Sequence, residues 1–129
     1  MRDLSKYRLD RATEFLSEAE LLFQAGTFKG SINRSYYAIF TAVRALLAEE
    51  EKDFKKHSAV IAYFRQYYIK TKIFDKKFSD YIGDAFEIRN NCDYEDFYIV
   101  SREEAEIQYN HAVEFYKAIK NFLEVREWN

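Results

Sequence analysis

The sequence has no proline and only three glycines in 129 residues. Proteins built from many short strands need these residues in their turns, so their scarcity argues against an all-β fold. A single cysteine excludes an internal disulfide and fits a reducing, cytoplasmic environment. No apolar run approaches the roughly 20 residues of a membrane-spanning helix, and the charged amino terminus is unlike a secretory signal. We therefore expect a cytoplasmic protein without a membrane span.

A strong excess of charge of one sign is also lacking. The 20 basic and 22 acidic residues give a net charge of −2, which provides no overall attraction to nucleic acid or to an anionic membrane. The two signs nevertheless separate along the chain. Residues 52–77 carry eight basic and two acidic side chains, whereas residues 78–110 carry two basic and nine acidic ones. The basic stretch is either a solvated face or a surface for RNA phosphates or an acidic partner protein.

Aromatic residues, by contrast, are abundant, with twelve Phe, eleven Tyr and one Trp. Each ring can bury about 150–250 Å² of surface, and one small domain has limited room for so many. One explanation is an aromatic core whose tyrosine hydroxyls reach solvent. The other is a subunit interface, because Tyr and Phe are enriched in the cores of interfaces. We favour a homodimer.

Apolar residues recur at three- and four-residue spacing in five segments, which is typical of amphipathic helices. Gly26 suits the end of the first helix, Asp75 the start of the fourth, and Ser101 with Glu104 forms a capping box for the fifth. Short connections favour antiparallel neighbours. The sequence therefore predicts an all-α, up-and-down bundle of four to five helices that forms one domain over residues 1–129. The predicted helices are 3–24, 28–49, 57–70, 75–91 and 101–126, with a loop over 92–100.

A polar segment lies where the fourth predicted helix ends and the loop after it begins. Arg89, Asn90, Asp93 and Tyr94 place a guanidinium, an amide, a carboxylate and a phenol in one stretch, a set that could bind a phosphate or a base. The helical phase puts Arg89 on the same side as Phe86, and an inward guanidinium needs a planar anionic partner. Alternatively, Arg89 stabilises the helix end and pairs with Asp93, Asn90 terminates the helix, and Tyr94 packs at the loop.

The second predicted helix supplies two more candidates. Arg34 either forms an ion pair with the first or fifth helix, or joins Arg89 in one cleft. In the second arrangement, Tyr37 or Tyr94 would stack on a base. Arg44 is expected to pair with surface carboxylates.

Several segments together resemble the HEPN-domain family. In residues 31–47 the resemblance lies in an Arg, a Tyr-Tyr pair and the apolar and small residues that follow. Two further matches are short motifs near the ends of predicted helices, and a fourth is the start of the last helix. The resemblance covers nearly the whole chain with its motifs in order: Arg34, Tyr36 and Tyr37; Lys56-His57-Ser58; Arg89-Asn90 with Asp93-Tyr94; and residues 101–105.

This resemblance implies a helical bundle that is usually dimeric. Many members are encoded beside a minimal nucleotidyltransferase, as toxin and antitoxin. Active members are metal-independent ribonucleases whose R-x4–6-H motif lines a cleft at the dimer interface. In some relatives the partner silences the ribonuclease by transferring a nucleotide to a nearby tyrosine.

The chain departs from the active pattern after Arg89. The residues four to seven positions further on are Asp, Tyr, Glu and Asp, and none is His. Metal-free RNA cleavage needs groups that exchange protons near neutral pH, which an ordinary Asp or Tyr does poorly. His57 is expected to serve the first turn of the third helix, and His111 to lie half-buried on the fifth. Without neighbouring Cys or clustered carboxylates, these two histidines indicate no metal site.

Three hypotheses follow from the sequence. The first is a HEPN-type nucleotide- or RNA-binding module that partners a minimal nucleotidyltransferase, uses no cofactor and lacks ribonuclease activity. The second is a metal-independent ribonuclease toxin, for which Arg89 is the one motif candidate. The third is a structural helical dimer without a ligand. The predicted ligand-binding residues are Arg89, Asn90, Asp93, Tyr94, Arg34 and Tyr37.

Overall fold

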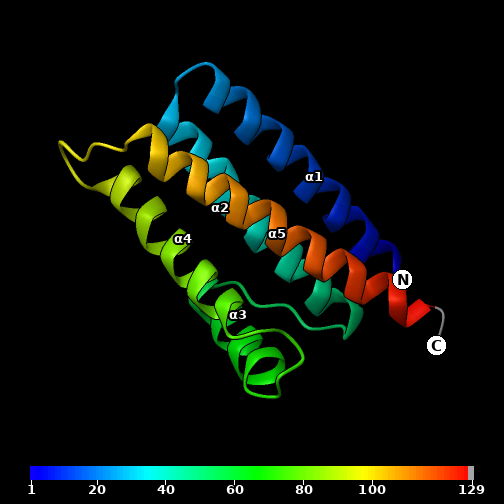
Figure 1. Ribbon diagram of the computed structural model, residues 1–129. Coiled ribbons are helices and arrows are strands. Elements are labelled where there is room, and N and C mark those ends of the chain that lie inside the picture. Colours follow the sequence, from blue (N-terminus) through cyan, green and yellow to red (C-terminus); the bar gives the residue numbers. More distant parts are fainter. Residues whose placement is uncertain (128–129) are drawn as a thin grey trace.

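Five α-helices and one short π-helical segment make up the computed structural model, which describes residues 1–127; these residues form no strand (Figure 1). The all-α prediction is confirmed. Within this range no helix is both long and apolar enough to cross a bilayer. The elements are α1 (Asp3–Gln24), α2 (Phe28–Glu49), α3 (His57–Phe64), the π-helical segment η1 (Arg65–Ile69), α4 (Lys77–Tyr94) and α5 (Arg102–Glu127).

Four long helices form the body of the molecule. In the order α1, α2, α4, α5, each helix reverses the direction of the one before (Figure 1). The first residues of α1 and the last turns of α5 therefore lie at the same end of the bundle. The α4–α5 connection lies at the opposite end, beside the turn between α1 and α2. Because α3 is short, it covers one side of α2 instead of extending the bundle.

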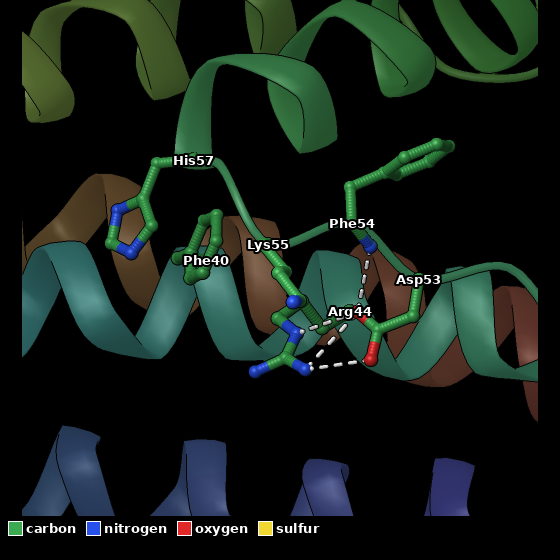
Figure 2. Close-up of a pocket in the computed structure, with 6 residues that line it drawn as sticks. All are labelled: Phe40, Arg44, Asp53, Phe54, Lys55 and His57. Atoms are coloured by element: carbon green, nitrogen blue, oxygen red, sulfur yellow. Dashed lines mark hydrogen bonds and ion pairs between the residues drawn. The ribbon is translucent and has the colours of Figure 1, made fainter.

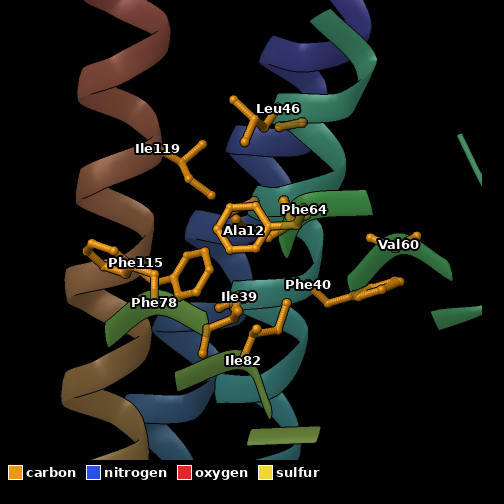
Figure 3. Close-up of a cluster of buried hydrophobic side chains, with 14 of the residues drawn as sticks. Ala12, Ile39, Phe40, Leu46, Val60, Phe64, Phe78, Ile82, Phe115 and Ile119 are labelled. Carbon is orange, nitrogen blue, oxygen red and sulfur yellow. The ribbon is translucent and has the colours of Figure 1, made fainter. Parts of the chain in front are cut away.

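Helix α2 is the centre of the fold and packs against α1, α3, α4 and α5. Small alanines on several of its sides allow close approach, and large apolar side chains fill the remaining space. Figure 3 shows Phe64, Phe78 and Phe115 meeting from three other elements in the same core. Each such buried side chain stabilises the fold by about 1.5–3 kcal/mol. Fully or almost fully buried residues of α2 include Ile32, Tyr36, Ile39, Val43, Leu46 and Leu47.

The helix ends largely follow the predicted signals. Gly26 has φ of +77°, the left-handed conformation expected after α1. Ser101 Oγ accepts a hydrogen bond from the Glu104 N–H at 3.0 Å, which is one half of the predicted capping box. Asp75 Oδ1 accepts from the Lys77 N–H at 2.9 Å. Helix α4 starts at Lys77, two residues later than predicted, so its N-cap is Lys76 and not Asp75, although the Asp75 carboxylate accepts the first N–H of the helix.

Two further predicted boundaries are wrong. The third helix is not α-helical to residue 70, because η1 widens the turn from Arg65 onward. Helix α4 does not end at residue 91 but continues to Tyr94, so Arg89 is not in its last turn and Asn90 does not terminate it. The chain has no Gly or Pro between residues 84 and 100 to stop the helix. An ion pair between Arg89 and Asp93, one turn apart, supports its continuation.

Candidate functional site

Arg89 projects from α4 toward α2, and three neighbours hold its guanidinium. Nη2 donates a hydrogen bond to the Tyr37 hydroxyl at 2.9 Å, and Nη1 donates to Asn90 Oδ1 at 3.1 Å. Nε lies 2.9 Å from Asp93 Oδ2 but is not aligned for a hydrogen bond, so this contact is an ion pair. The Arg89 side chain is only 15% exposed. Four of the predicted residues, Arg89, Asn90, Asp93 and Tyr37, therefore lie together.

Two aromatic rings form the surface on which this guanidinium rests. Arg89 Cζ lies 5.5 Å from the centre of the Tyr36 ring and 5.3 Å from that of Tyr37. At these distances a cation is attracted to an aromatic face, by about 0.5–2 kcal/mol depending on solvent exposure. Tyr36 is completely buried, so the surface beneath Arg89 is rigid. The guanidinium is thus fixed in place before any ligand arrives.

His57, which the sequence assigned only to the first turn of α3, contacts the same two tyrosines. Its Nδ1 is 2.7 Å from the Tyr36 hydroxyl, and its ring stands edge-on to Tyr37 at 6.1 Å. It also stacks on Phe40, with ring centres 4.0 Å apart. The Tyr36–Tyr37 pair of α2 therefore brings Arg89 and His57 into one site. The sequence offered the Tyr-Tyr pair and the Lys56-His57-Ser58 motif as signals, but no spacing that relates them to Arg89.

The electrostatics of this cluster keep Tyr36 and His57 uncharged at neutral pH. Burial, together with the positive charges of Arg89 and Arg44, holds the pKa of His57 below its ordinary value of 6.5. Burial raises the pKa of Tyr36 far above that of an ordinary phenol, so its hydroxyl stays protonated. At neutral pH, therefore, His57 is an uncharged imidazole hydrogen-bonded to an uncharged phenol. An imidazole in this state can accept a proton.

Beyond His57 the site opens into a pocket of about 380 Å³ (Figure 2). Arg44 and Asp53 lie at its far end, where Arg44 Nη2 approaches Asp53 Oδ2 at 2.9 Å and Oδ1 at 3.1 Å. The predicted pairing of Arg44 with a carboxylate is confirmed. Arg8 of α1 binds the same carboxylate, with Nη2 3.1 Å from Oδ2. The lining residues are Phe40, Arg44, Asp53, Phe54, Lys55 and His57.

The two remaining predicted residues lie outside this cluster of contacts. Arg34 Nε is 3.5 Å from Glu18 Oε1 of α1, which is the alternative ion pair that the sequence predicted. Its Nη1 donates to Asn33 Oδ1 at 2.6 Å. Tyr94 is the last residue of α4 and is 75% exposed. A role for Arg34 or Tyr94 in ligand binding stays a prediction.

His111, the second histidine of the sequence, lies between α4 and α5. The His111 ring stacks on Tyr81 at 3.8 Å, and burial lowers its pKa. Its buried Nδ1 has no hydrogen-bond partner among residues 1–127. Over the same range, no three His, Cys, Asp or Glu side chains are grouped as metal ligands would be.

Comparison with known proteins establishes the family. The HEPN domain matches residues 5–122, and the chain therefore belongs to the HEPN-domain family, as its motifs predicted. A protein of Methanocaldococcus jannaschii named "Putative toxin MJ0142" is 32% identical over 122 residues, which cover 95% of this chain and 82% of that relative. A UPF0332 protein of Thermotoga maritima is 33% identical over 119 residues, covering 92% and 90% of the two chains.

Proposed function

We propose that this HEPN protein binds the phosphate groups of RNA or of a nucleotide at Arg89. The observation that carries this proposal is the guanidinium held over Tyr36 and Tyr37, mostly out of solvent. A planar, always-charged fork of N–H donors matches the oxygens of a phosphate. An incoming phosphate would take the place of the Asp93 carboxylate beside Nε.

The neighbours of Arg89 add donors for the same anion. The Tyr37 hydroxyl accepts from Arg89 Nη2 and so keeps its own hydrogen for a phosphate oxygen. The Asn90 amide accepts through Oδ1 and keeps its two N–H donors. A phosphate at this place would therefore have donors from three side chains, two on α4 and one on α2.

The test of this proposal is binding of a fluorescently labelled, single-stranded RNA octamer, measured by anisotropy. Arg89→Ala should weaken binding at least tenfold, which corresponds to about 1.4 kcal/mol. Arg102→Ala is the matched control, because Arg102 also lies over a ring, that of Phe23, but on the exposed face of α5. Equal binding by the Arg89 and Arg102 variants, with both folded by circular dichroism, would contradict the proposal. If no variant and no wild-type protein binds RNA or nucleotide, the structural dimer without a ligand becomes the better hypothesis.

The proposed partner is a minimal nucleotidyltransferase that acts as antitoxin to this chain. Support comes from the family and from two relatives of M. jannaschii that are named "Putative toxin". Co-expression with a nucleotidyltransferase encoded beside the gene tests this directly. The two proteins should co-purify as a complex of defined stoichiometry. Any growth arrest caused by this chain alone should be relieved when the nucleotidyltransferase is co-expressed. Growth arrest that persists despite co-purification would count against the antitoxin role.

A second candidate function, metal-independent RNA cleavage, is favoured by the position of His57. The sequence argued against this activity because no histidine follows Arg89, but an imidazole from α3 lies across the tyrosine pair instead. If Nδ1–H donates to the Tyr36 oxygen, Nε2 is free to accept the proton of a ribose 2′-hydroxyl. The 2′-oxygen then bonds to phosphorus, the bond from phosphorus to the 5′-oxygen breaks, and solvent protonates the leaving oxygen. The products are a 2′,3′-cyclic phosphate and a 5′-hydroxyl end.

This candidate is tested with an RNA octamer in EDTA, analysed by gel and mass spectrometry. Cleavage should be lost in His57→Ala, in which RNA binding should persist, and should continue in His111→Ala, the other half-buried histidine. Because the pKa of His57 is lowered, the rate should rise with pH through a midpoint below 6.5 and then level off. Wild-type protein that binds RNA without cutting it would remove this candidate and leave the binding proposal intact.

A further inference from the structure

The pocket beyond His57 carries more positive charge than its own side chains neutralise. Asp53 is the one acidic residue in the lining, and it is shared by Arg44 and Arg8. It also accepts the Phe54 N–H through Oδ1 at 2.9 Å. Burial alone would raise the pKa of Asp53, but the hydrogen bonds and charges of Arg44 and Arg8 outweigh it and keep the carboxylate ionised. One negative charge therefore faces two guanidiniums.

The remaining donors at this end of the pocket have no protein partner. Lys55 lines the pocket and makes no hydrogen bond or ion pair with any group in residues 1–127. Arg44 uses Nε and Nη2 on Asp53, and across the same residues its Nη1 contacts no acceptor. Figure 2 shows the Arg44–Asp53 pair on one side of the pocket and His57 on the other. An added anion would complete the charge balance here.

The rest of the lining is flat and apolar. The rings of Phe40 and His57 stack on each other, and Phe54 lies across the pocket from them (Figure 2). A volume of about 380 Å³ falls in the range of small-molecule sites. Aromatic surfaces beside unpaired cations are the combination with which proteins hold single-stranded nucleic acid. The lining therefore suits an anion attached to a planar group, which describes a nucleotide.

His57 connects this pocket to the Arg89 site. Its ring forms one wall of the pocket and also contacts the two tyrosines that hold Arg89. Arg44 lines the same pocket as His57, and Arg89 lies over the two tyrosine rings that His57 contacts. Both cationic places therefore have His57 as a shared neighbour.

From this arrangement we infer that the Arg44–Lys55 pocket is a second phosphate site, so that the ligand is a single RNA strand spanning at least two consecutive phosphates. One phosphate lies at Arg89, the next lies at Arg44 and Lys55, and the sugar between them faces His57. The inference rests on the proposed function, because it needs Arg89 as the first site. It adds the class of ligand: an oligonucleotide is bound in preference to a mononucleotide.

The experiment compares Lys55→Ala with Lys52→Ala, which removes an exposed lysine of the same loop that does not line the pocket. Binding of the RNA octamer and of adenosine monophosphate is measured at several salt concentrations. Lys55→Ala should weaken octamer binding about fivefold and make its salt dependence shallower by about 0.7 in the log–log slope, the value for one phosphate contact on a single strand. Lys55→Ala should weaken binding of adenosine monophosphate less than binding of the octamer, because a mononucleotide can occupy Arg89 alone. Lys52→Ala should stay within about twofold of the wild type.

The outcomes separate this inference from the proposed function. If Lys55→Ala binds the octamer like Lys52→Ala while Arg89→Ala loses binding, the second site is refuted and the first one stands. If Arg89→Ala binds normally, the proposed function fails, and a continuous path through both sites fails with it. A mononucleotide that binds as tightly as the octamer would also overturn the second site. Both lysines are exposed, so neither substitution is expected to disturb folding.

Discussion

Two half-buried histidines make the stability of this protein depend on pH in a defined direction. Burial lowers the pKa of both, and for His57 the charges of Arg89 and Arg44 act in the same direction. For His111 the carboxylates of Glu114 and Asp84 oppose the shift without cancelling it. A group whose pKa is lower in the folded state takes up a proton on unfolding. The folded state therefore loses stability as the pH falls below the unfolded value of 6.5.

We predict that His57→Gln reduces this loss. The variant gives up the hydrogen bond to Tyr36 and so starts from a lower stability at pH 7.5, but its free energy of unfolding should fall less steeply between pH 7 and pH 5.5. Urea denaturation at three pH values measures the slopes. Carboxylates with lowered pKa, such as Glu49 and Asp53, lose their contribution at lower pH, below about 4.5 and 3.8, and do not interfere. Parallel lines for variant and wild type would show that the His57 shift is absent.

The sequence indicated some of the individual residues of the candidate site. Arg89, Asn90 and Asp93 lie within five positions of one another, so helical geometry alone brings them together. Tyr37 was a candidate because of its motif, and it binds the same guanidinium from α2. His57 was missed, because its bond to Tyr36 joins residues 21 positions apart on different elements. Only tertiary packing creates that contact.

At the scale of single elements, a close contact joins η1 to α4. Arg65 Nε donates to Ser79 Oγ at 2.9 Å, and its Nη2 donates to the Ser79 carbonyl at 3.1 Å. Its guanidinium covers Gly83, where an added Cβ would lie 2.6 Å from Nη2. A methyl group at position 83 must therefore displace Arg65. The absence of a side chain at Gly83, in the interior of α4, leaves room for the Arg65 guanidinium.

We predict that the effect of Gly83→Ala depends on Arg65. Alanine in a helix interior is favoured over glycine by about 1 kcal/mol, and this gain should appear in full when Arg65 is already Ala. In the wild-type background the gain should be cancelled or reversed, because two hydrogen bonds are lost, each contributing about 0.5–1.5 kcal/mol. Chemical denaturation of the four proteins of this double-mutant cycle gives the coupling energy. Equal effects of Gly83→Ala in both backgrounds would mean that Arg65 does not occupy this place.

The helices were predictable from their 3.6-residue periodicity, and the bounds of α1 and α2 agree with the prediction to the residue. Where tertiary packing determines the local backbone structure, the prediction from the sequence was incomplete. The π-helical turn of η1 brings Tyr68 completely into the core beside Phe64 and Phe74, a result that no local preference of Arg65–Ile69 signals. The extension of α4 depends on an ion pair that forms only once the helix has passed residue 91.

For the whole molecule, the aromatic composition is partly explained within one chain. Rings of α3, η1, α4, α5 and the segment before α4 form one connected set of contacts: Phe64, Tyr68, Phe78, Phe115 and Phe74. Tyr36 belongs to a separate set with Phe40 and Phe86. Other rings remain outside both sets. Phe97 is 99% exposed and Tyr94 75%, both at the α4–α5 end of the bundle. The expectation of a homodimer therefore stays a prediction.

We expect a solution mass twice the 15.5 kDa of the chain. Size-exclusion chromatography with light scattering, at concentrations between about 1 and 100 μM, measures it directly. Phe97→Ser offers a probe of the exposed aromatic end, with Tyr7→Ser, an exposed ring on α1, as the control. A mass of one chain at every concentration would rule out the dimer and place the exposed rings in another role.

The order of the elements and the all-α class followed from the sequence, whereas the central position of α2 did not. Its many small residues, including Ala38, Ala42 and Ala45, let neighbours approach on several sides, and only the assembled bundle reveals which neighbours they are. The Arg44–Lys55 pocket likewise forms only when the elements of the fold pack together. Arg8 and Asp53 lie 45 positions apart and meet only when α1 packs against the loop after α2.

Because α4 continues beyond Arg89, the Asp93 carboxylate lies beside the Arg89 guanidinium, and an anionic ligand would have to displace it. Because Asp93 stays on the helix one turn away, it occupies the guanidinium whenever no ligand is present. A solitary small anion, such as chloride or sulfate, gains little by evicting a carboxylate that is tethered and always at hand. A polymer with many phosphates returns after each displacement, since its other groups keep it near. On the proposal that RNA binds at Arg89, the length of one helix would therefore set a threshold that simple inorganic anions do not pass.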